Sequence, residues 1–85
     1  MARFYMHLVN SVGFITDEEG TEAPDLEGAR NTAVTAIRAL LSEEVKGGTL
    51  NLKGRIEIAD SEGAELAIVS FSDAVHVMPV TDEHT

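Results

Sequence analysis

The chain has 85 residues, 15 of them acidic and 6 basic, and its formal net charge is -9. This length fits one domain, and so short a chain buries only about 60–65% of its unfolded surface, so we expect a thin core. The scattered basic residues argue against direct nucleic-acid binding, and the lack of Cys excludes disulfides and thiolate metal sites.

No apolar run approaches the ~20 residues needed to cross a bilayer. The first residues of the chain also lack the apolar segment of a signal peptide. We therefore expect a cytoplasmic protein without membrane contact.

The N-terminal residues predict a strand pair. Residues 3–9 alternate in a strand pattern, but Phe4, Met6 and Leu8 on one face and Tyr5, His7 and Val9 on the other are both largely apolar. Residues 10–13 contain Asn and Gly and predict a turn, after which residues 14–16 return as a short strand.

Residues 17–27 form an acidic stretch in which six of eleven side chains are carboxylates. Gly20 and Pro24 interrupt it, so we expect a loop. Its end predicts a helix start, because the Asp25 carboxylate can cap the first turn and Glu27 complements the helix dipole.

From Leu26 to about Val45 the apolar period becomes 3.6, which predicts a helix ended by Gly47-Gly48. Arg30 falls within the apolar stripe of this helix. Its guanidinium suits an anion or a partner carboxylate, but we favour a side chain whose stem packs on the sheet while its head reaches Glu27 or the acidic loop. The stripe consists of Leu26, Ala29, Ala33, Ile37, Leu40 and Leu41.

The second half predicts a β-hairpin. Residues 55–60 form a strand with Ile56 and Ile58 inward and Arg55 and Glu57 outward. Residues 60–63 suit a turn that ends in a left-handed Gly, and residues 65–71 return as a strand that is apolar on both faces. Residues 75–78 are a candidate last strand, and residues 79–85 a flexible tail after a single domain of residues 1–78.

The fold class expected from these elements is α+β, a small antiparallel ββαββ sheet with one helix on one face. Strands that are apolar on both faces are buried on both. One helix covers only one face, so the other needs the C-terminal tail or a second copy of the chain, and we expect a homodimer.

Two clusters are candidates for chemistry. The acidic loop offers oxygens to a cation, but its spacing does not fit a calcium-binding loop, and a solvated loop is the favoured interpretation. His7 and His76 meet only if the first and last strands pair, and a half-buried His7 with a hydrogen-bond partner is favoured over a metal ligand. The loop acids kept as candidates for interaction or structural polar roles, with Arg30 and His7, are Asp17, Glu18, Glu19 and Glu22.

Enzyme signatures are missing from the sequence. There is no Cys nucleophile, no serine nucleophile elbow and no glycine-rich phosphate loop before a helix. We therefore expect a protein that is not an enzyme, with no catalytic residue, metal or cofactor.

The assembled motifs resemble a family of short bacterial proteins catalogued only as a domain of unknown function. The resemblance extends to about Val77 and implies a small α+β fold, but it carries no activity, substrate or site residue. The motifs are Arg3-Phe4-Tyr5-Met6-His7-Leu8, Asp17-Glu18-Glu19-Gly20-Thr21-Glu22, Pro24-Asp25-Leu26 with Ala29-Arg30, Arg55-Ile56-Glu57-Ile58 with Asp60-Ser61-Glu62-Gly63, and Phe71-Ser72-Asp73-Ala74-Val75.

A second resemblance is to small antitoxin domains that place an acidic Glu-Gly turn and Pro-Asp-Leu before a helix. Here the helix begins directly at Pro24-Asp25-Leu26, without the intervening segment of those domains. The leading hypothesis is a non-enzymatic, homodimeric interaction or regulatory module. The alternatives are an antitoxin-like binder of a basic partner protein and, less favoured, a cation-binding protein.

Overall fold

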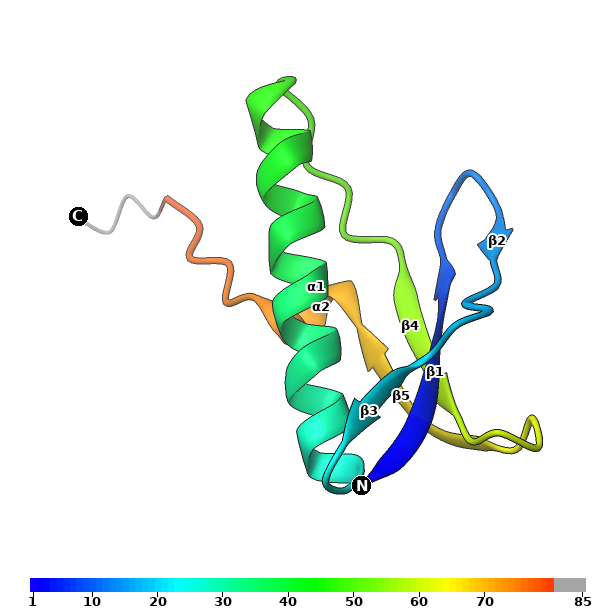
Figure 1. Ribbon diagram of the computed structural model, residues 1–85. Coiled ribbons are helices and arrows are strands. Elements are labelled where there is room, and N and C mark those ends of the chain that lie inside the picture. Colours follow the sequence, from blue (N-terminus) through cyan, green and yellow to red (C-terminus); the bar gives the residue numbers. More distant parts are fainter. Residues whose placement is uncertain (81–85) are drawn as a thin grey trace.

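A computed structural model describes residues 1–80 of the chain. It contains one antiparallel sheet with a long helix across one face, which confirms the predicted α+β class (Figure 1). The elements of residues 1–80 are β1 (Ala2–Val9), β2 (Phe14–Ile15), β3 (Thr21–Ala23), α1 (Leu26–Lys46), β4 (Arg55–Ala59), β5 (Glu65–Ser70) and α2 (Phe71–Ala74).

The strands follow the order β2-β1-β4-β5, and β3 also pairs with β1. One edge of β1 is therefore shared by two short strands: β3 lies opposite Ala2–Phe4, and β2 lies opposite Leu8 and Val9. The other edge of β1 pairs with β4, which pairs in turn with β5 through the predicted hairpin. The free edge beyond β5 is therefore the longest in the sheet.

Helix α1 begins and ends as its sequence predicts. The Asp25 carboxylate accepts a hydrogen bond from the Gly28 N–H at 2.8 Å and so caps the first turn. The helix ends at Lys46, and the left-handed backbone falls on Gly48, whose φ is 91°.

The core lies between α1 and one face of the sheet. Small residues at four-residue spacing, Ala29 and Ala33, let the helix lie close to the strands, and Ile37 and Leu41 continue the buried line. Phe71 closes the core at the end of β5. The sheet contributes Phe4, Ile56, Ile58 and Val69 to this core.

The composition of the acidic stretch predicts a loop, but part of the stretch forms a strand. Thr21–Ala23 forms β3, because the neighbouring β1 offers free backbone groups along the same edge. Ala23 is buried, and Arg3 on β1 pairs with Glu22 on β3 at 3.2 Å. Tertiary pairing therefore creates a strand that local propensity does not favour.

The expected final strand at residues 75–78 is wrong. Phe71, expected to end the preceding strand, instead begins α2, and its N–H donates to the Gly54 carbonyl oxygen at 2.8 Å. The short helix redirects the chain, so Val75 to Val77 line a groove with α1 instead of pairing with β5. The tail predicted at residues 79–85 lies partly outside the described residues, which end at Val80.

The expected place of Arg30 in the apolar stripe is also wrong. The buried line follows Ala29, Ala33 and Ile37, and Arg30 is exposed although it lies one turn from Leu26 and Val34. A long charged side chain at the border of a stripe extends into solvent, where its head stays hydrated. Among residues 1–80, no ion pair joins Arg30 to the acidic loop.

Candidate functional site

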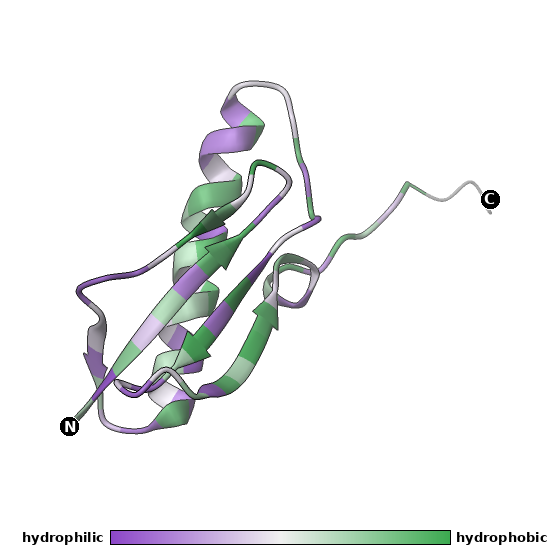
Figure 2. Ribbon diagram, turned by 90° about the vertical axis from the view of Figure 1, so that its right-hand side faces the viewer, coloured by the Kyte–Doolittle hydropathy of each residue, from purple (hydrophilic) through white to green (hydrophobic). Residues whose placement is uncertain are grey.

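The side of the sheet away from α1 carries no helix within residues 1–80. In Figure 2 this side faces the viewer and α1 lies behind the strands. We call it the open face. Strand alternation and register place Tyr5, His7, Val9, Phe14, Arg55, Glu57, Leu66, Ile68 and Ser70 on it.

Side chains on the open face form rows across the strands. One row joins Phe14, Val9, Arg55 and Ser70, and the next joins His7, Glu57 and Ile68. The rings of His7 and Phe14 lie 5.7 Å apart, and Arg55 Nε donates to Glu57 Oε2 at 2.9 Å. The strand charges therefore pair with each other between apolar neighbours.

Large apolar side chains remain exposed on the open face. The exposed fractions are 56% for Phe14, 44% for Ile68 and 41% for Leu66. The expectation that the last hairpin strand is buried on both faces thus fails within a single chain: only Ala67, Val69 and Phe71, on its helix side, are covered. An apolar face of this kind is characteristic of a contact surface.

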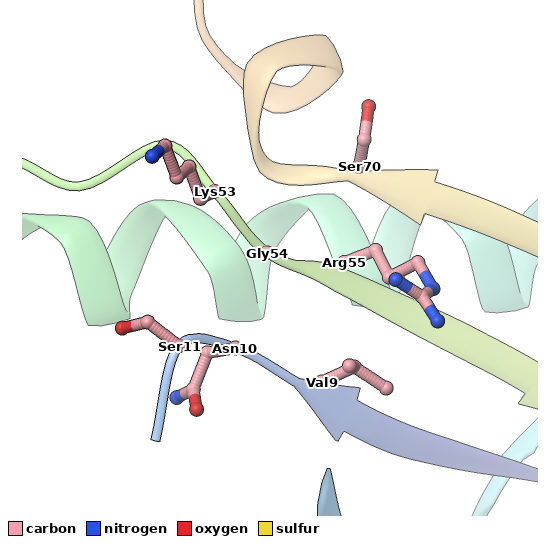
Figure 3. Close-up of a pocket in the computed structure, with 7 residues that line it drawn as sticks. All are labelled: Val9, Asn10, Ser11, Lys53, Gly54, Arg55 and Ser70. Atoms are coloured by element: carbon pink, nitrogen blue, oxygen red, sulfur yellow. The ribbon is translucent and has the colours of Figure 1, made fainter. Parts of the chain in front are cut away.

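A shallow pocket of about 450 Å³ lies at one end of the open face, where β1, β4 and β5 come together (Figure 3). Lys53 and Arg55 both line it, but their charged ends point to opposite sides of the pocket. Because the two cations do not converge, we treat the pocket as an extension of the open face. Its lining residues are Val9, Asn10, Ser11, Lys53, Gly54, Arg55 and Ser70.

Asp17 fills the gap that β2 and β3 leave along β1. Its carboxylate accepts hydrogen bonds from the Met6 N–H at 2.9 Å and the Gly20 N–H at 3.1 Å. The Asp17 N–H in turn donates to His7 Nδ1 at 3.0 Å. On the edge of β1 that β2 and β3 share, no strand lies opposite the middle of β1. Asp17 and His7 supply hydrogen bonds there instead, which is a structural role for both candidates.

The surroundings of Asp17 favour its ionised form. Partial burial alone would raise the pKa of its carboxyl, but hydrogen bonds from the Met6, Gly20 and Glu19 backbone and the nearby His7 outweigh this and hold the pKa below its ordinary value of 3.8. A pKa that is lower in the folded chain stabilises the fold above the unfolded-state pKa. That stability is lost as the pH falls through the folded-state pKa.

We expect Asp17→Asn to lower the free energy of unfolding by about 1 kcal/mol at pH 7, a value reduced for the partial exposure of the carboxylate. The difference from the wild type should begin to shrink as the pH falls below about 3.8, the ordinary pKa of Asp, and should disappear only below the lower pKa of Asp17 in the folded chain. Urea unfolding followed by circular dichroism between pH 7 and 2.5 measures both. Glu18→Gln, an exposed neighbour with the same charge change, is the control, and an equal loss for both variants would contradict the role of Asp17.

The other candidates of the acidic loop lie apart from the open face. Glu18 is exposed, Glu22 pairs with Arg3, and the Glu19 carbonyl oxygen accepts from the Arg3 guanidinium at 2.6 Å. Among residues 1–80, no group of three or more His, Asp or Glu side chains is placed to hold a metal ion.

The histidines do not meet. His7 lies on β1 beside Phe14, whereas His76 lines the groove along α1 with Leu41, Val45 and Leu50. The pairing of the first and last strands that would join them is absent from the observed sheet. His84 lies outside the described residues.

Sequence reasoning missed the exposed aromatic of the open face and the role of Asp17. The period-two pattern did place Arg55 and Glu57 on the outer face, but Phe14 sits in a two-residue strand too short to show a pattern. The signal that could have found Asp17 is its position two residues after β2, where the chain leaves the sheet.

No helix within residues 1–80 has the length and apolarity to cross a membrane. A family model described as a domain of unknown function, DUF6894, matches residues 3–72. The matched residues include β2 to β5, α1 and all of β1 except Ala2. No curated protein and no solved structure matches the chain.

Proposed function

We propose that this chain, which belongs to the family described as a domain of unknown function (DUF6894), is a small non-enzymatic protein-interaction module that forms a homodimer through its open face. The observation that carries the proposal is the exposure of Phe14, Leu66 and Ile68 on a sheet side without a helix. Covering these side chains gains the free energy of apolar burial, about 25 cal/mol per Å².

Charge supports a second copy of the chain as the occupant of this face. The chain carries a formal charge of -9, so two copies repel each other over most of their surfaces. In the middle of the open face, Arg55 and Glu57 form an ion pair, whereas Glu65 lies at its end, opposite Ala59. Two copies that meet across the rows of Arg55 and Glu57 therefore bring no unpaired carboxylates together.

The face also has the make-up of an interface centre. Apolar and aromatic side chains surround one hydrogen-bonded ion pair, with His7 packed against Phe14. Interfaces between identical chains are usually two-fold symmetric, so each row of the face would contact the equivalent face of the partner. Arg55 and Glu57 of one copy can exchange hydrogen bonds with those of the other.

The proposal is tested by sedimentation velocity between about 1 and 500 µM chain. We expect the wild type to sediment as a dimer in the upper part of this range. Ile68→Lys places a cation among the apolar side chains of both copies, so the dimer should dissociate at least about tenfold more readily, a factor that corresponds to about 1.4 kcal/mol.

Val45→Lys is the matched control, because Val45 is also exposed and apolar but lies on α1, away from the sheet. This variant should sediment like the wild type. A wild type that remains monomeric at 500 µM would refute self-association. A dimer weakened equally by both variants would refute the open face as its surface.

The proposal retains the cytoplasmic location and bacterial origin expected from the sequence. Of the alternatives, cation binding gains no support from Asp17, whose carboxylate oxygens accept backbone N–H groups. Binding of a basic partner has support at a different place in the sheet.

A further inference from the structure

The two edges of the sheet differ in how they are protected. At one edge, β2 has two residues and β3 has three, and the Asp17 carboxylate occupies the gap between them. At the other edge, β5 has six residues, Glu65–Ser70, with no Lys and no Pro among them. Exposed strand edges are normally guarded by shortness, Lys, Pro or a covering segment, so the free edge of β5 lacks the usual protection.

Figure 2 shows β5 at the border of the sheet with no further strand beside it. The Phe71 N–H donates to the Gly54 carbonyl oxygen and therefore points toward β4. Backbone groups alternate in direction along an antiparallel strand, so the N–H groups of Ile68 and Ser70 point to the free edge. These groups are available to another strand.

The surroundings of this edge are acidic. No Lys or Arg follows Arg55 in the sequence. The turn before β5 carries Asp60 and Glu62, β5 itself begins at Glu65, and α2 after it carries Asp73. These four carboxylates lie toward the two ends of β5, and none of them takes part in an ion pair within residues 1–80. An approaching strand therefore meets negative charge at both of its ends.

The geometry points to the free edge of β5 as a docking site for an extended, basic segment of another protein, which adds to the sheet as a further antiparallel or parallel strand. Backbone hydrogen bonds to Ile68 and Ser70 hold such a segment, and its cationic side chains reach the carboxylates at the ends of β5. Its apolar side chains continue the open face beside Leu66 and Ile68. This inference does not depend on the homodimer.

A second copy of the chain is a poor occupant for this edge. An antiparallel pair of β5 strands would bring Glu65 of each copy near Asp73 of the other, with no cation at hand. Like charges in opposed strands are destabilising. Charge thus assigns the neutral open face to self-association and the acidic edge to a basic partner.

The test uses a synthetic eight-residue peptide of alternating Lys and Val, added to the full-length wild-type chain and followed by the amide NMR signals of the protein. We expect the Ile68 and Ser70 amides to shift and to become protected from hydrogen exchange. The affinity should fall at least about tenfold between 50 and 300 mM salt, because surface charge attraction is screened. The same peptide with N-methyl groups on alternate residues keeps its charge but cannot pair, so it should bind much more weakly.

Ser70→Pro tests the backbone contact. Ser70 has a φ of -81°, close to the value that Pro requires, and its N–H is not directed at β4, so the variant keeps the fold of the chain. We expect it to bind the Lys-Val peptide about three- to tenfold more weakly, the factor of one net hydrogen bond. Ser70→Ala keeps the N–H and should bind like the wild type.

Charge is tested with two double variants, each of which removes two negative charges at a different place in the chain. Glu62→Gln with Glu65→Gln lies beside β5 and should weaken peptide binding and reduce its salt dependence. Glu18→Gln with Glu19→Gln lies in the acidic loop at the opposite edge and should leave binding unchanged.

Three results would overturn the inference: no binding of the Lys-Val peptide at 1 mM, equal binding of its N-methylated form, or equal weakening by the two double variants. Sedimentation of the protein without peptide separates these results from the homodimer. Loss of peptide binding in a Ser70→Pro chain that still dimerises shows that the edge acts alone. Phe14→Lys places its cation on the open face at the opposite edge of the sheet, so peptide binding by this monomeric variant shows that the peptide does not need the dimer.

Discussion

Replacing Phe71 with Ala is expected to lower the free energy of unfolding by about 3–5 kcal/mol, the usual cost of removing a buried aromatic ring. Phe71 is 1% exposed and is one of the three largest fully buried side chains of the described residues. A chain of 85 residues has a total stability of only about 4–13 kcal/mol, so this one ring carries a large share of it.

The measurement is urea unfolding followed by circular dichroism, at a concentration low enough to keep the chain monomeric. Phe14→Ala is the matched control, since Phe14 is 56% exposed, and it should cost less than about 1 kcal/mol. If Phe71→Ala does not fold, Phe71→Leu gives a measurable variant with an expected loss under about 2 kcal/mol. Equal losses at the two phenylalanines would contradict the position of Phe71 in the core.

The second large effect is expected at Gly54, the residue before β4. A methyl group there would lie 2.6 Å from a carbon of the Phe71 ring, closer than two carbon atoms can approach. We expect Gly54→Ala to lower the free energy of unfolding by about 1–3 kcal/mol, the range for overpacking a core. The Phe71 ring can therefore pack against residue 54 only because this residue has no side chain.

Two further variants isolate this cause. Gly47→Ala should be nearly neutral, because Gly47 has a φ of -88° and only a carbonyl oxygen at 3.5 Å from the added carbon. The double variant Gly54→Ala with Phe71→Leu should lose less free energy of unfolding than the sum of the two single losses, because the smaller side chain leaves room for the methyl group. Strictly additive losses in this double variant would show that the ring is not what the methyl group meets.

The parts of the fold that sequence predicts are those set by local signals. Asp25 caps α1, the 3.6 period carries the buried line to Leu41, and the turn that ends with Gly63 joins β4 and β5. The cap, the helical repeat and the hairpin turn each depend on residues that are close together in the sequence. Local chemistry is therefore sufficient to place them.

The parts that sequence misses depend on partners far away in the chain. Strand β3 exists because Arg3 and its neighbours offer an unpaired edge, and Asp17 acts on Met6, eleven residues earlier. Arg38 on α1 donates from Nε to the Ala74 carbonyl oxygen at 2.6 Å, a contact that exists only once α2 forms. Of the candidate site, the pattern shows which strand faces are apolar, but not which of them α1 leaves uncovered.

Strand β1 pairs with β2 and β3 on one edge and with β4 on the other, and these partners are synthesised at different times. β2 and β3 follow β1 closely and can pair with it as soon as residue 23 is available, whereas Leu8 must wait for Ile56, 48 residues later. The 33 residues between residue 23 and Ile56 take roughly 2–7 s on the ribosome, at about 5–20 residues per second. During that time the Asp17 contact to Met6 holds one edge of β1, while its other edge stays open to unwanted pairing. Nascent chains are therefore most exposed to misassembly just before β4 emerges.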